Sequence, residues 1–262
     1  MKAELREQQV LAMYDVRGIQ SYIFKSNAAK EIVGASVLVE KIITEGLQEY
    51  VNIQEKKMST YMMDWKNDDS KAFLENQEIE MQIMFIGGGN AYVLFRHGRE
   101  CEKVNQFLAK YLLDRTYSLN LAVAVVPKTE DYRNDYDAIN SKMCEIKASM
   151  PLNMPVGAMP FMAVDTITGY PITNKDTKGN YYSTEASLKR AAFPKLEDEK
   201  FFDNMVTEKG DSSTLAVFHI DGNSMGNLIR NTMKDINGYE DAITKMRKLS
   251  LTISGTFRQT VD

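Results

Sequence analysis

The chain has 262 residues, of which 44% are apolar and 26% charged, and its formal net charge is −4. This composition is typical of a folded globular protein and excludes disorder over most of the chain. It also lacks the strong positive charge of a dedicated nucleic-acid-wrapping protein. The longest apolar run, Leu119 to Val126, is broken by Asn120 and is far shorter than the roughly 18–20 residues of a membrane-spanning helix. Because charged residues stand where a signal peptide would be apolar, we expect a cytoplasmic protein without a membrane partner.

The cysteines and histidines are too few and too scattered for a zinc centre. The chain contains two of each, at Cys101, Cys144, His97 and His219. A structural zinc site needs four such ligands at paired spacings, so no zinc is expected. Cys101 shares a helical stripe with Val104, Leu108 and Leu112, which predicts a packed core thiol.

Strand and helix patterns alternate through the first half of the chain. The expected elements are a strand over 10–14 that ends at Asp15, a helical pattern after Gly18 that is strongest over 32–47, strands over 81–86 and 91–95, a helix from 98 and a strand over 119–126. Glycines and Asn90 between the two middle strands predict a β-hairpin. The order β-α-β-β-α-β predicts an α+β, ferredoxin-like domain over residues 1–130. Its two helices would cover one face of a four-stranded antiparallel sheet, with Asp15 beside the hairpin.

The opening pattern returns near the C-terminus. Residues 131–213, which begin with a predicted helix over 131–149, are expected to form a helical and irregular linker. A β-rich run over 214–220 then ends at Asp221, before a glycine-containing turn and a helix over 239–261. We interpret residues 214–262 as the start of a second, repeated unit.

The second unit has too few residues to repeat the first in full. Gly89 follows Asp15 by 89 − 15 = 74 residues, whereas 262 − 221 = 41 residues follow Asp221. A lone strand and helix would leave a sheet edge unpaired and a helix face uncovered. We therefore expect that the sequence is truncated, that strands come from another chain, or that the second unit is vestigial.

A carboxylate at a strand end opposite a glycine hairpin is the palm arrangement of nucleotidyl-transfer enzymes. Mg²⁺ demands oxygen ligands, and carboxylates on neighbouring strands can hold two ions. Glycines allow triphosphate oxygens to approach backbone N–H groups. Taken singly, the aspartate is more commonly a turn former or helix cap and the hairpin a tight turn. Their combination, with the repeat, favours a nucleotide site.

Several segments resemble the palm region of the large subunit of type III CRISPR effector complexes. The family has a Gly-Ile-Gln-x-[Phe/Tyr]-Ile motif, an Arg-Gly-x-Ser-like helix start, a degenerate glycine hairpin and a second palm that opens with Asp-Gly-Asp-Asn-Met-Gly. The similar segments here are Asp15-Val-Arg-Gly-Ile-Gln-Ser-Tyr-Ile-Phe24, Gly34-Ala-Ser-Val-Leu38, Phe85-Ile-Gly-Gly-Gly-Asn-Ala-Tyr-Val-Leu-Phe95 and His219-Ile-Asp-Gly-Asn-Ser-Met-Gly226. Residues 164–172 are similar to the linker between the two palms.

The resemblance implies ATP binding and Mg²⁺-dependent synthesis of cyclic oligoadenylate in antiviral defence. By position, Asp15 and Asp221 would be the metal-binding carboxylates. The nucleotide-binding residues it implies are Gly18, Ile19, Gln20, Ser36, Gly87, Gly88, Gly89 and Asn90 in the first unit, and Gly222, Asn223, Ser224, Met225 and Gly226 in the second. Other effector subunits, and guide RNA through them, would be the partners.

Departures from the family pattern leave catalysis open. Asn223 stands where the family has a second aspartate, and Asn90 leaves the first hairpin without an acid. The family's catalytic Gly-Gly-Asp-Asp hairpin does not occur in the sequence, and no catalytic set is complete. The alternatives are a cyclase whose acidic hairpin lies on a longer chain, a catalytically degenerate nucleotide-binding protein, and a scaffold subunit.

Overall fold

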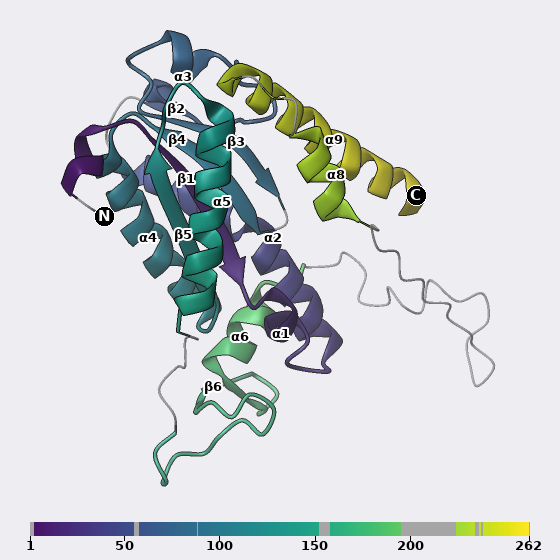
Figure 1. The fold of residues 1–262 in the computed structure, drawn as a ribbon. Helices are drawn as coiled ribbons and strands as arrows, with labels where there is room; N and C mark the ends of the chain where they lie inside the picture. Colours follow the sequence, from purple (N-terminus) through teal and green to yellow (C-terminus); the bar gives the residue numbers. More distant parts are fainter. Residues whose placement is uncertain are drawn as a thin grey trace.

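The computed structural model describes residues 3–54, 58–87, 89–151, 158–194, 224–233, 236 and 238–261. The main sheet has five strands: β1 (Val10–Arg17), β2 (Tyr61–Met62), β3 (Met81–Gly87), β4 (Asn90–Phe95) and β5 (Asn120–Pro127). The helices packed around it are α1 (Ile19–Ile23), α2 (Ala29–Ile53), α3 (Ala72–Glu75), α4 (Gly98–Thr116), α5 (Tyr132–Ser149) and α9 (Tyr239–Val261), and α8 (Met225–Thr232) lies beside α9 (Figure 1). A small hairpin of β6 (Ile172–Lys175) and β7 (Tyr181–Ser183) leads into α6 (Thr184–Ala191).

The fold is α+β, with a mostly antiparallel sheet in the order β2-β3-β4-β1-β5. Strand β1 lies between β4 and β5 and is antiparallel to both, and β3 is antiparallel to β4. The expected four strands are all present. The expectation of only four is wrong, because β2 adds a short parallel strand beside β3. Strand β1 also continues to Arg17, so Asp15 lies within the strand rather than after it.

Alternating side chains of β1 divide the core into two layers. Val10, Ala12 and Tyr14 face the layer covered by α2 and α4, whereas Leu11 and Met13 face the layer covered by α5 and α9. Figure 1 shows these helix pairs on opposite sides of the sheet. The first layer was predicted from the helical periodicity. The second was not, because α5 and α9 follow the predicted domain in sequence.

Helix α9 packs its N-terminal half against the first sheet. Ile243 is completely buried there, and Arg247 donates from Nε to the Met84 carbonyl at 3.3 Å and from Nη2 to the Ile83 carbonyl at 3.2 Å. The expectation of an uncovered helix face is therefore wrong for this half of α9. The predicted strand over 214–220 lies outside the described residues, and the domain boundaries at 130 and 213 remain predictions.

Helix α6 packs against α2 in backbone contact. An ideal Cβ at Gly34 would lie 1.8 Å from the Lys189 carbonyl oxygen, so only glycine permits this approach. Lys189 is 1% exposed and donates from Nζ to Glu185 Oε1 and to the Tyr22 carbonyl, both at 2.6 Å. The segment after α5 is thereby tied to the C-terminal end of α1. Among the described residues, no helix has both the length and the apolar character needed to cross a membrane.

Candidate functional site

The hairpin between β3 and β4 meets the start of α1 at one end of the sheet. Gly18 and Gly89 both adopt the left-handed conformation, with φ of 79° and 81°. The Val16 N–H donates to the Gly89 carbonyl at 2.9 Å, which ties the hairpin to β1. A Cβ on Gly89 would lie 2.7 Å from Ile19 Cδ1. The structure therefore brings the Gly-Ile-Gln turn and the glycine hairpin into direct contact, as the motifs predicted.

Asp15 lies beside this junction and forms an ion pair with Lys147 of α5. Asp15 pairs in register with Asn90 on β4 and with Ala122 on β5. By strand alternation its side chain shares the face of Leu11 and Met13, which is the side that α5 covers. A second contact holds the same end of α5, because Arg17 Nη1 donates to the Met150 carbonyl at 3.1 Å.

Asn90 carries a buried oxygen that no described residue satisfies. Its Oδ1 has no hydrogen-bond partner among the described residues, although the residue as a whole is partly exposed. On the same strand face, the Tyr92 hydroxyl donates to Asn140 Oδ1 at 3.4 Å. Burial raises the pKa of Tyr92, and the nearby Tyr136 and Asp15 raise it further. An acceptor without a donor favours a ligand that brings an N–H or O–H group.

Some of the other predicted residues of the first unit lie beside the glycine junction, and one lies away from it. Gln20 is exposed on α1 next to the junction, and Gly87 ends β3 opposite Asn90. Ser36 instead lies well inside α2, where its exposed hydroxyl donates to the Ile32 carbonyl at 3.0 Å. Gly88 lies outside the described residues.

The second unit repeats the local backbone of the first where it is described. Ser224 adopts the left-handed conformation, with φ of 57°, immediately before α8. It follows Asp221 by three residues, as Gly18 follows Asp15 by three. A short helix and then a long helix follow in both units. Non-glycine residues seldom adopt this conformation, and the internal repeat remains a prediction. The predicted site residues Asp221, Gly222 and Asn223 lie outside the described residues, while Met225 and Gly226 open α8.

The described residues around Asp15 do not fit a magnesium site. Mg²⁺ is held in proteins by carboxylates in a near-octahedral oxygen shell. Here one carboxylate is already paired with an ammonium, and the opposing side chain is a neutral amide. Within the described part of the chain, no group of three or more His, Cys, Asp or Glu residues could hold a metal ion. Magnesium at Asp221 remains a prediction, and so does the expectation of no zinc.

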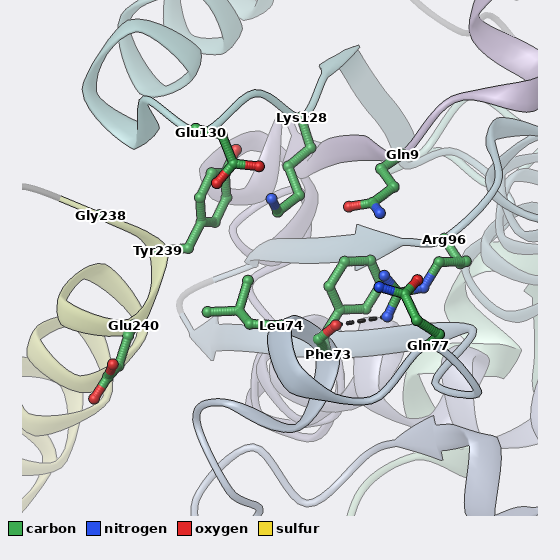
Figure 2. Close-up of a pocket in the computed structure, with 10 residues that line it drawn as sticks. All are labelled: Gln9, Phe73, Leu74, Gln77, Arg96, Lys128, Glu130, Gly238, Tyr239 and Glu240. Carbon is green, nitrogen blue, oxygen red and sulfur yellow. Dashed lines mark hydrogen bonds between the residues drawn. The ribbon is translucent and has the colours of Figure 1, made fainter.

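A cavity of about 420 Å³ lies at the other end of the sheet (Figure 2). It opens between α3, the ends of β4 and β5, and the start of α9. Burial lowers the pKa of both Arg96 and Lys128 in its wall. Arg96 is already engaged with three backbone carbonyls, those of Phe73, Asn76 and Ile79. None of the residues predicted from the motifs lines this cavity.

Sequence reasoning missed Lys147 as a member of the site. The signal that locates it is its spacing, because Ile139, Met143 and Lys147 recur every four residues along α5. Ile139 and Met143 are buried against the sheet, so this spacing places Lys147 on the same face. Its partner lies 132 residues away in the sequence, which no local pattern reveals.

No family model and no curated protein matches the chain. Among solved structures, crystal structures of a Csm1–Csm4 cassette are similar, including the apo form and the complexes with AMPPNP and with cA4. Each is 15% identical with a TM-score of 0.37. The match covers 56% of this chain and 20% of the apo chain, and 55% and 19% for the two complexes. The chain thus spans about a fifth of the proteins it matches. At this TM-score the likeness is too distant to assign a function.

Proposed function

We propose that residues 10–127 form a ferredoxin-like palm unit that binds a nucleotide at its glycine hairpin, with ATP as the expected ligand. Strands β1 and β3 are each antiparallel to β4, which lies between them, so β1 and β3 are parallel to each other. A ferredoxin-like fold has the same split β-α-β pairing, with its last strand beside its first, as β5 lies beside β1. The strand order therefore supports the palm assignment that the motifs suggested.

The observation that carries the proposal is the junction of Gly18 and Gly89 beside Asp15 and Asn90. Both glycines are left-handed, but only Gly18 is exposed, because Gly89 is buried with Ile19 Cδ1 2.7 Å from where its Cβ would lie. The exposed Gly18 backbone leaves room for phosphate oxygens at this edge of the sheet. The unsatisfied Asn90 oxygen and the exposed Gln20 amide add polar groups for the base or the ribose.

A titration with ATP tests the location of this site. We expect Gln20→Ala to weaken ATP binding several-fold without affecting stability, because the side chain is exposed. Gln77→Ala is the matched control, since Gln77 is also exposed but lines the cavity at the other end of the sheet. Unchanged binding in Gln20→Ala with weakened binding in Gln77→Ala would place the nucleotide in that cavity and contradict the proposal.

For the whole protein, we propose a role in type III CRISPR defence beside other effector subunits, on the strength of the motifs. Synthesis of cyclic oligonucleotides would need Mg²⁺ and an acidic hairpin in a completed second unit. Asp15 and Asp221 alone are too few carboxylates for a two-metal site. Mass spectrometry of products formed from ATP and Mg²⁺ by the intact protein with its partner subunits tests this step, and the absence of any product contradicts it.

Three features favour a second candidate, a catalytically degenerate nucleotide-binding or scaffold subunit. Asn90 faces Asp15, Lys147 neutralises that carboxylate, and Asn223 replaces an acid of the family pattern. All three features reduce negative charge where metal ions would bind. A degenerate nucleotide-binding subunit would bind a nucleotide without turnover, whereas a scaffold subunit would neither bind nor convert a nucleotide.

A further inference from the structure

The contact between Asp15 and Lys147 joins a strand to a helix that lies far away in the sequence. The Asp15 side chain is 13% exposed, and that of Lys147 is 39% exposed. The carboxylate is therefore largely shielded from water, while the ammonium remains open to solvent on one side. A shielded carboxylate strongly favours a cation at contact distance.

The packing of α5 on the sheet places Lys147 next to Asp15. Ile139 and Met143, two turns and one turn before it, are 0% and 2% exposed and fix the orientation of α5 on the sheet. Lys147 continues their stripe at the next turn. The bond from Arg17 to the Met150 carbonyl then holds the end of α5 at the end of β1. The ammonium is thus placed by buried packing on one side and by a hydrogen bond on the other.

The strand beside Asp15 offers a divalent cation no second charge. Asn90, its register partner, is a neutral amide whose Oδ1 has no partner among the described residues. Asp15 and Lys147 together carry no net charge. A metal ion approaching Asp15 would meet a carboxylate that is already compensated, and the adjacent ammonium would repel it.

We propose that Lys147 occupies the place of a divalent metal at Asp15 and excludes metal from the first unit. In the nucleotide complex, which rests on the proposed function, the phosphates at this edge meet the Lys147 ammonium in place of Mg²⁺. The first-unit site is then a metal-independent site for the anionic part of a nucleotide.

Manganese binding to the full chain, followed by electron paramagnetic resonance without nucleotide, tests the exclusion. We expect no contribution of Asp15 to Mn²⁺ binding in the wild type, so Asp15→Asn leaves the titration unchanged. The double variant Lys147→Met/Asn90→Asp places two uncompensated carboxylates on adjacent strands and should bind Mn²⁺ at least ten-fold more tightly. Adding Asp15→Asn to that variant should abolish the gain. Lys142→Met/Asn90→Asp is the control, because Lys142 lies on the same helix but donates to the Val125 carbonyl at 2.6 Å.

Three results would overturn the proposal. The first is a Mn²⁺ affinity that is lower in Asp15→Asn than in the wild type. The second is a Lys147→Met/Asn90→Asp variant that gains no Mn²⁺ affinity although its circular dichroism and melting curve show a folded protein. The third is a gain of the same size in the Lys142→Met/Asn90→Asp control. The nucleotide part is tested separately by ATP titration with and without EDTA. We expect unchanged affinity in EDTA and at least a ten-fold loss in Lys147→Met but not in Lys142→Met. If the wild type binds no ATP at all, the proposed function fails while the metal result still stands or falls on its own.

Discussion

Substitution of Gly89 by alanine tests the contact between the hairpin and α1. Two costs add at this position. A non-glycine residue in the left-handed conformation costs about 1–2 kcal/mol, and Gly89 has φ of 81°. The new Cβ would also lie 2.7 Å from Ile19 Cδ1. Because that methyl is the end of a flexible side chain, moving it off its rotamer costs about 1 kcal/mol. We therefore expect Gly89→Ala to destabilise the protein by about 2–3 kcal/mol.

Gly169 provides the matched control for the backbone cost alone. Its φ is 71°, and a Cβ there would meet no atom within 4 Å. Gly169→Ala should therefore cost about 1–2 kcal/mol, and the difference between the two variants measures the contact with Ile19. In urea denaturation, Ile19→Val should cost about 1 kcal/mol alone but should close the gap in the Gly89→Ala background. Equal destabilisation of the two glycine variants, or no rescue by Ile19→Val, would refute the proposed packing of the junction.

The remaining predictions concern the core and the thiols. Lys189→Met should destabilise the protein by about 3 kcal/mol in urea denaturation, because it removes the buried ammonium of the Glu185 carboxylate and leaves only the partly exposed Lys25 at 3.5 Å; a loss below about 1 kcal/mol would show that the pair is dispensable. Ile243→Ala should cost about 2–4 kcal/mol, whereas Leu251→Ala on the exposed part of α9 should cost less than about 0.5 kcal/mol; similar small losses would mean that α9 does not pack on the first sheet. Burial raises the pKa of Cys101 to about 12, so Ellman's reagent should label only Cys144 in the native protein. Since the unfolded thiol ionises at lower pH, the contribution of Cys101 to stability should be complete below pH 8 and should decline as the pH rises toward 12; rapid labelling of both thiols at pH 8 would contradict its burial.

Periodic segments were predictable from the sequence nearly to the residue. Helices 132–149 and 239–261, the hairpin at residues 87–90 and the strand that ends at Pro127 follow from spacing and turn residues alone. The contact between the Gly-Ile-Gln turn and the hairpin also follows, because the predicted strand order places both at the same end of the sheet.

Long-range features were not predictable in the same way. Strand β2 and helix α3 lie in a polar stretch, where Tyr61 and Phe73 are the buried anchors but show no period. The packing of α9 on β3 depends on a helix more than 150 residues from its partner strand. Lys147 reaches Asp15 only because α5 lies across the sheet. Such placements follow from tertiary packing, which local propensity does not encode.

Photocrosslinking with 8-azido-ATP, mapped by mass spectrometry of the tryptic peptides, would locate the bound nucleotide on the chain. We expect crosslinks in residues 17–24 and 85–95, on the two sides of the glycine junction, that disappear in excess ATP and survive EDTA. Specific crosslinks confined to residues 73–77 and 238–240, which line the cavity at the other end of the sheet, would contradict the account. The absence of any crosslink that ATP competes away would contradict nucleotide binding by this chain altogether.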